Sequence, residues 1–223
     1  MRISIFGLGY VGAVCAGCLS ARGHEVVGVD VSRTKIDLIN HGKSPIVEPG
    51  LEELLQQGLK SGRLRGTTDV SAAVQETQVS FICVGTPSKK NGDLSLDYIE
   101  GVCREIGFAL RDKAERHTVV VRSTVLPGTV KDVVIPIIED CSGKRAGVDF
   151  GVAVNPEFLR ESTAIKDYDF PPMTVIGELD KASGDLLETL YRELDAPIIR
   201  KPVEVAEMIK YTCNVWHAAK VTF

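Results

Sequence analysis

Residues 2–12 read Arg2-Ile3-Ser4-Ile5-Phe6-Gly7-Leu8-Gly9-Tyr10-Val11-Gly12. A β-rich run, Arg2–Phe6, leads directly into the pattern G-x-G-x-x-G, and an apolar helical run follows over Val11–Arg22. In that context the first glycine permits a tight turn, the second lets a pyrophosphate approach the backbone, and the third lets the helix pack closely on the sheet. We therefore expect Gly7, Gly9 and Gly12 to form a dinucleotide-binding turn rather than an ordinary glycine cluster.

An acidic residue, Asp30, follows the second expected strand and lies 18 positions after Gly12. A carboxylate at this point can accept hydrogen bonds from both ribose hydroxyls of an adenosine, and it repels the extra phosphate of NADP. Arg33 is close enough to favour NADP, but a surface arginine at a helix start is common. Lys35 would contact the ribose or phosphate, or it is a solvated helix lysine. The predicted cofactor is NAD, with Asp30 as its ribose ligand.

Short β-rich runs alternate with helical runs along most of the chain, which predicts βαβ units and an α/β fold. Right-handed crossovers make a doubly wound parallel sheet, the Rossmann fold, the expected topology. Strands are expected at Arg2–Phe6, Glu25–Val29, Arg65–Thr68, Val79–Val84, Thr118–Arg122, Phe150–Val154 and Met173–Gly177. Helices are expected at Val11–Arg22, Ser32–Asn40, Leu51–Lys60, Val70–Glu76, Leu96–Leu110, Thr129–Glu139 and Lys181–Leu194.

The organisation changes after Asn155, where prolines punctuate a segment rich in short turns. A last helix begins near Val203 and is still running at Phe223, without a terminal glycine, proline or polar tail. We expect a Rossmann domain over residues 1–200, and the start of a helical central domain of a longer enzyme over residues 201–223.

The composition excludes several classes of partner. The formal net charge is −4 and no Lys/Arg cluster is present, so neither nucleic acid nor an anionic membrane is an expected partner. No apolar run is long enough to span a bilayer, and the N-terminus lacks a secretory cleavage site. We expect a cytoplasmic protein.

The cysteines are scattered, mostly among apolar neighbours, and we expect buried, reduced thiols. Cys15-x-x-Cys18 has the spacing of a redox or zinc pair, but it falls inside an apolar helix. No second Cys/His pair follows at zinc spacing, so no metal site is predicted. The six are Cys15, Cys18, Cys83, Cys103, Cys141 and Cys213.

Three further groups of residues are candidates for a site. Thr86 and Thr124 each follow an expected strand, where such sheets place ligands, although both are also plausible helix N-caps. Glu157 and Glu161 are four apart, so a helical turn would put two carboxylates on one face to hold a water and take a proton, or they are a solvated acidic turn.

The last helix carries the third group, one polar stripe made by Lys210, Asn214 and His217, which are spaced by four and three. An ammonium beside an amide can stabilise a developing oxyanion. The other reading is an amphipathic helix with no further role, since its opposite side is mostly apolar.

These motifs together resemble the UDP-glucose/GDP-mannose dehydrogenase family. The resemblance covers the whole chain, and the motifs occur in the family's order: Ile5–Gly12, Val84–Pro87, Ser123–Val125, Asn155–Leu159 and Lys210–Asn214. It implies oxidation of a sugar's primary alcohol by NAD in two steps, through a cysteine-bound thioester, to a carboxylate. The runs Phe158–Ser162 and Asn214–His217 favour GDP-mannose as substrate, giving GDP-mannuronate for alginate.

The resemblance also implies roles for individual residues. Lys210 and Asn214 would stabilise the oxyanion and contact substrate, and Glu157 with a water would handle protons. Glu161 would contact the substrate or help to activate the hydrolytic water, and His217 would contact the substrate. The helix that begins in residues 201–223 would form a homodimer interface. NAD would be held by Tyr10, Val11, Asp30, Lys35, Thr86 and Thr124, beside the three glycines.

One departure from the family is large. Its nucleophile lies in a Gly-Gly-Ser-Cys-like motif beyond the central helix, and none of the six cysteines has that context. The second Rossmann domain, which binds the nucleotide sugar, is also missing, so we expect an N-terminal part that is inactive alone.

Three alternatives stay open. The substrate is UDP-glucose or another nucleotide sugar. The chain belongs to another NAD enzyme, such as a hydroxyacid dehydrogenase, which would not explain both the Asn155–Glu161 run and the Lys210/Asn214 pair. The chain is a cofactor-binding fragment without catalysis.

Overall fold

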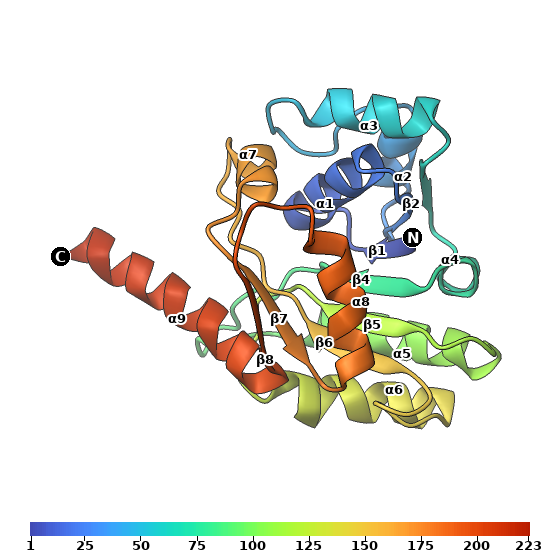
Figure 1. Ribbon diagram of the computed structural model, residues 1–223, viewed down its shortest axis with the longest axis vertical. Helices are drawn as coiled ribbons and strands as arrows, with labels where there is room; N and C mark the ends of the chain where they lie inside the picture. Colours follow the sequence, from blue (N-terminus) through green and yellow to red (C-terminus); the bar gives the residue numbers. More distant parts are fainter.

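Eight strands form one sheet in the computed structural model, which describes residues 1–223 (Figure 1). The strands lie in the order β3-β2-β1-β4-β5-β6-β7-β8. All pairs from β3 to β6 are parallel, which confirms the doubly wound α/β fold. Their bounds are β1 Arg2–Phe6, β2 Glu25–Val29, β3 Leu64–Thr67, β4 Val79–Ile82, β5 Thr118–Val121, β6 Gly151–Val154, β7 Thr174–Glu178 and β8 Ile198–Pro202.

Helices cover both faces of the sheet. One hydrophobic core lies under α1, α2, α3, α7 and α8, and the other lies under α4, α5, η1, α6 and the start of α9. None of the helices is both long and apolar enough to cross a membrane. Their bounds are α1 Tyr10–Ala21, α2 Arg33–Asn40, α3 Leu51–Lys60, α4 Val70–Glu76, α5 Asp97–Arg111, η1 Val130–Val134, α6 Ile135–Ser142, α7 Ala164–Asp169, α8 Lys181–Tyr191 and α9 Val203–Thr222.

Alternation along each strand divides the apolar side chains between the two cores. In β1, Ile3 and Ile5 enter the first core and Phe6 enters the second. All residues of β4, β5 and β6 are buried, as expected for inner strands covered on both faces. The C-terminal half of α9 instead extends away from the sheet (Figure 1).

Several expectations need correction. The sheet is not wholly parallel, because β7 pairs with β6 antiparallel. The expected helix Thr129–Glu139 is split into a π-helical turn, η1, and α6, since Pro136 has no N–H for a regular helical hydrogen bond. Two elements, α7 and β8, were not expected. The last strand, β8, ends at Pro202, close to the predicted end of the Rossmann domain at residue 200.

Five of the six cysteines are buried, and none forms a disulfide. Cys15 and Cys18 both lie inside α1, where they belong to the first hydrophobic core. Cys213 differs from the expected burial and is half-buried, because it lies on the part of α9 that leaves the sheet.

A buried polar network joins three strands near the starts of β4 and β5. The hydroxyl of Ser80 lies 2.8 Å from that of Ser4 and 2.7 Å from Nε2 of His117. His117 Nδ1 lies 3.1 Å from the carbonyl oxygen of Thr77, so the neutral ring donates there and accepts from Ser80. Burial, and secondarily the nearby Lys113 ammonium, lower the pKa of His117 from 6.5 to about 3.

This network predicts a pH dependence of folding stability. Above pH 6.5, His117 is neutral in the folded and the unfolded chain and contributes nothing to it. As the pH falls below that value, only the unfolded chain binds the proton, so the free energy of unfolding drops by up to about 1.4 kcal/mol per pH unit.

The variant His117→Gln should lose less stability than the wild type as the pH is lowered, when both are unfolded with urea at a series of pH values. His41→Gln changes an exposed histidine and is the control. Parallel stability curves for the wild type and His117→Gln would contradict the prediction.

Candidate active site

The turn between β1 and α1 is built from a close approach of two glycines. Gly7 has φ +93°, and a Cβ atom at Gly12 would lie only 1.9 Å from the carbonyl oxygen of Gly7. A Cβ at Gly9 would meet nothing within 4 Å, so this position faces open space. No side chain caps the start of α1, which leaves backbone N–H groups of its first turn free for an anion. The turn therefore fits a pyrophosphate.

Asp30 is fixed at the end of β2 by three donors. Its carboxylate accepts from the backbone N–H of Leu8 at 2.8 Å, from that of Ser32 at 2.9 Å and from Nζ of Lys35 at 3.1 Å. Only 8% of Asp30 is exposed, yet it lines a cleft of about 590 Å³ together with Gly9 and Lys35. Since carboxylate oxygens have about four acceptor sites, one remains for a ribose hydroxyl.

The Lys35–Asp30 ion pair was not expected. Lys35 lies in the first turn of α2, whose N-cap is Ser32, and this turn directs the lysine back to the carboxylate. A helix that starts three residues after the aspartate and carries a lysine in its first turn is the sequence signal that would have found the pair. Arg33, the residue that could favour NADP, is exposed.

Two loops at the same edge of the sheet contact each other. The hydroxyl of Thr86 donates to the carbonyl oxygen of Thr124 at 2.9 Å, and that of Ser123 donates to the carbonyl of Val84 at 2.6 Å. No helix begins at Thr86 or Thr124, so the helix-cap reading of these residues is wrong. The structure brings both threonines together in the loops after β4 and β5, and β4 pairs with β1, the strand that leads into the dinucleotide turn.

The chain leaves β6 through a buried polar network. The guanidinium of Arg122 donates to Asn155 Oδ1, and the hydroxyl of Tyr191 donates to the same oxygen at 2.6 Å. The amide of Asn155 donates to the carbonyl of Val175 at 2.9 Å. These bonds fix the backbone immediately before Glu157.

The expected helical turn over Glu157 and Glu161 is absent. Residues 155–160 have no regular secondary structure. The backbone N–H of Leu159 donates a hydrogen bond to the carboxylate of Glu157, at 2.6 Å, instead of to a backbone carbonyl as in a helix. Glu161 is exposed and forms no hydrogen bond, so the two carboxylates do not share a helical face.

Glu157 instead pairs with the last helix. Nζ of Lys210 lies 3.1 Å from Oε1 of Glu157 and 5.3 Å from the ring centre of Phe158. Lys210 is only 7% exposed, whereas Asn214 and His217 are exposed and their side chains form no hydrogen bond. The expected polar stripe is therefore split, because α9 leaves the sheet after Lys210.

Glu207 anchors the same helix to the sheet. Its carboxylate, 1% exposed, accepts from the N–H of Gly128 at 2.7 Å and from that of Val130 at 2.9 Å. It thus caps the start of η1, and its burial raises its pKa. The pair of Lys210 with Glu157 lies one turn further along α9.

Sequence reasoning missed a second buried carboxylate, Glu48. It accepts a hydrogen bond from the hydroxyl of Tyr10, the first residue of α1, and bonds from two backbone N–H groups in the segment after β6. Burial and Glu48 together raise the pKa of the Tyr10 phenol. No local pattern marks Glu48, because its partners are at least 38 positions away along the chain.

Comparison with known proteins agrees with this arrangement. Residues 1–195 match the model of the NAD-binding domain of the UDP-glucose/GDP-mannose dehydrogenase family. The chain is 86% identical over 223 residues to GDP-mannose 6-dehydrogenase of Pseudomonas aeruginosa, covering 100% of this chain and 51% of that protein. It thus spans about half the length of the curated relatives that it matches.

Solved structures give the same result. A crystal structure of a ternary complex of GDP-mannose dehydrogenase from Pseudomonas aeruginosa superimposes with a TM-score of 0.99, over 100% of this chain and 51% of that one. A UDP-glucose dehydrogenase from Pyrobaculum islandicum superimposes with a TM-score of 0.92 at 42% identity, over 96% of this chain and 49% of that one. The chain belongs to the UDP-glucose/GDP-mannose dehydrogenase family, and its cofactor is NAD.

Proposed function

We propose that the whole protein oxidises GDP-mannose to GDP-mannuronate, a precursor of alginate, with NAD. The observation that carries this proposal is the buried pair of Lys210 and Glu157 at the edge of the sheet where the dinucleotide turn lies. Residues 1–200 would hold NAD, and residues 201–223 would begin the central helix.

The cofactor would lie along the glycine turn. The free N–H groups at Gly9, Tyr10, Val11 and Gly12 would bind the pyrophosphate, and Asp30 with Lys35 would hold the adenosine ribose. Thr86 and Thr124 would border the nicotinamide half. When bound, NAD supplies the oxidant for both steps of the reaction.

Lys210 and Glu157 have the geometry for proton and charge handling at the sugar. One N–H of the ammonium is used by Glu157, and its other donors remain for an oxygen that develops negative charge. Each oxygen of Glu157 accepts one protein hydrogen bond and keeps a site for a water. Glu161, Asn214 and His217 would contact the substrate from the exposed rim of this pair.

The overall reaction balances as one primary alcohol, two NAD⁺ and one water giving one carboxylate, two NADH and three protons. The intermediate aldehyde would be captured by a cysteine thiol, and the resulting thioester would be hydrolysed. None of the six cysteines here has the family's nucleophile motif, so that thiol would come from outside residues 1–223.

The similarities favour GDP-mannose over UDP-glucose as the substrate. Identity is 86% to the GDP-mannose enzyme and 42% to the UDP-glucose enzyme over nearly the same span.

Homodimer formation through α9 is supported by its exposed apolar side chains, Met208, Val215, Trp216 and Val221.

NAD binding should depend on Asp30. A hydrogen bond to a charged group contributes roughly 1.5–3 kcal/mol, so Asp30→Ala should weaken NAD binding about tenfold or more by calorimetry. Asp37→Ala, which changes an exposed aspartate on the same helix as Lys35, should leave the affinity unchanged. NADP should bind the wild type less tightly than NAD. Equal NAD affinities of Asp30→Ala and the wild type would refute the assignment.

Removing the Lys210 side chain should lower turnover far more than it lowers the affinity for NAD. In the full-length protein, Lys210→Ala should lower the rate of GDP-mannuronate formation by about a hundredfold, since one oxyanion donor is lost. Lys60→Ala removes an exposed lysine of α3 and is the control.

Residues 1–223 alone should bind NAD, and mass spectrometry should find no GDP-mannuronate formed by them. Failure of the wild type to oxidise GDP-mannose would overturn the proposed function, and unchanged turnover in Lys210→Ala would remove the lysine from it.

A further inference from the structure

Glu48 is a buried carboxylate that joins three separate parts of the chain. It lies in the loop between α2 and α3 and is 7% exposed. Oε1 accepts from the N–H of Ala164 at 2.9 Å, and Oε2 accepts from the N–H of Ser162 at 2.9 Å and from the hydroxyl of Tyr10. No cation pairs with Glu48, so these three donors supply its stabilisation.

The turn that Glu48 holds contains a strained residue. Ser162 has φ +70°, and it is the only residue other than glycine with a positive φ. A side-chain-bearing residue keeps this conformation only when its surroundings impose it. The N–H of Ser162 is bonded to Glu48, and the preceding residue is Glu161, which points to solvent from the same turn.

The other end of the turn is fixed separately. The carboxylate of Asp167 accepts from the backbone N–H of Arg160 at 2.9 Å, from its Nη2 at 2.7 Å and from the hydroxyl of Thr163 at 3.0 Å. Asp167 thus holds the turn to α7, whereas Glu48 holds it to the loop before α3 and to α1.

Tyr10 makes the connection to the cofactor side. It is the first residue of α1, inside the glycine motif, and its hydroxyl donates to Glu48 and lies 3.2 Å from the carbonyl oxygen of Arg160. A shift of the turn at Arg160 therefore disturbs both partners of this hydroxyl at once.

We infer that Glu48 is a positioning residue that sets where Glu161 stands relative to the dinucleotide turn. This inference rests on the proposed function, in which Glu161 contacts the nucleotide sugar. Without the carboxylate, the N–H of Ser162 loses the acceptor that holds this residue at a positive φ. The backbone of the turn then changes, and the Glu161 side chain moves from its present position. Glu48 touches neither substrate nor cofactor in this role and acts through Glu161 and Tyr10.

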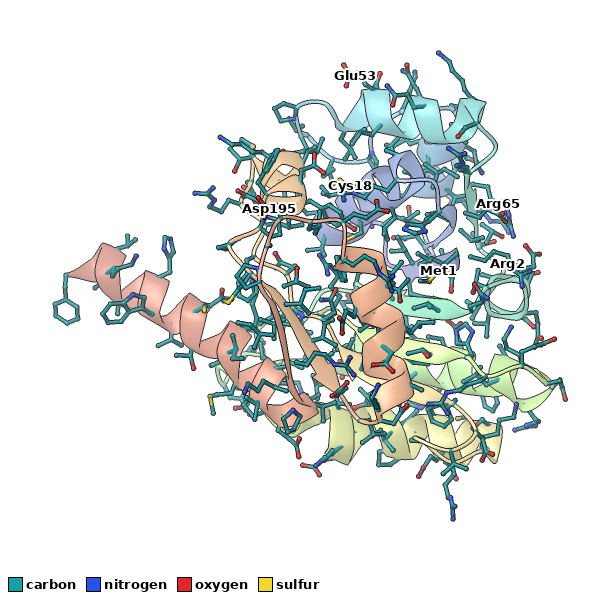
Figure 2. The ribbon with its side chains drawn as sticks, viewed as in Figure 1. Met1, Arg2, Cys18, Glu53, Arg65 and Asp195 are labelled. Atoms are coloured by element: carbon teal, nitrogen blue, oxygen red, sulfur yellow. The ribbon has the colours of Figure 1, made fainter.

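The test is a double-mutant cycle in the full-length protein. In Glu48→Gln one oxygen still accepts, but the amide N–H₂ faces the remaining backbone donor. At saturating NAD, Glu48→Gln should raise the KM for GDP-mannose about tenfold, the effect of losing one charged hydrogen bond. In a Glu161→Gln background it should add little, since the residue through which it acts is already changed. Glu53→Gln, on the solvent side of α3 (Figure 2), is the matched control.

Hydrogen exchange gives a readout that does not need turnover. The backbone donor that faces the amide N–H₂, either Ser162 or Ala164, should exchange faster in Glu48→Gln, and both should exchange at the wild-type rate in Glu53→Gln. If Glu48→Gln does not fold, Tyr10→Phe, which removes a single donor, should raise KM by a smaller factor with the same non-additivity.

The outcomes separate this inference from the proposed function. Independent, additive effects of Glu48→Gln and Glu161→Gln on KM, or unchanged exchange at Ser162 and Ala164, would overturn the positioning role. A wild type that oxidises no nucleotide sugar would instead overturn the proposed function, and the exchange rates would still decide whether Glu48 holds the turn.

Discussion

The carbonyl oxygen of Gly7 lies where any side chain at residue 12 would have to go, and the rest of the site depends on this contact. Because residue 12 has no Cβ, the start of α1 packs directly on the ends of β1 and β4. The free N–H groups of α1 then point over the carboxyl edge of the sheet, where Asp30, Thr86 and the segment after β6 also lie. A parallel sheet brings these ends together, although they are far apart in the sequence.

The segment after β6 has irregular backbone, and buried polar groups determine its path. Asn155 is held by Arg122 and Tyr191 as the strand ends, and Glu48 and Asp167 hold the next turn. Between these anchors, the carboxylate of Glu157 faces the ammonium of Lys210. Burying such an ion pair costs desolvation, and losing one partner leaves an uncompensated charge. The pair therefore makes the site depend on where α9 begins, which Glu207 fixes by capping η1.

The sequence predicted the features that are local. The glycine spacing, the position of Asp30 and the alternation of strands and helices are set by neighbouring residues and by one repeating pattern. The burial of Lys210, the hydrogen bonds that Glu48 accepts from the turn after β6, and the antiparallel pairing of β7 were not predictable. Each depends on partners more than 20 positions away. The helical turn expected over Glu157 and Glu161 was wrong, because side chains take the backbone N–H groups that such a turn would use: Glu157 itself binds that of Leu159, and Asp167 and Glu48 bind those of Arg160 and Ser162.

The central claim is that one edge of this sheet holds NAD along the glycine turn, with its reactive end toward Lys210 and Glu157. The most direct measurement is a crystal structure of the protein with NAD bound. The account predicts pyrophosphate oxygens within hydrogen-bond distance of the backbone N–H groups at the start of α1, the adenosine ribose on Asp30, and the nicotinamide on the side of Glu157. A pyrophosphate bound away from α1, or a nicotinamide directed away from the Lys210–Glu157 pair, would contradict it.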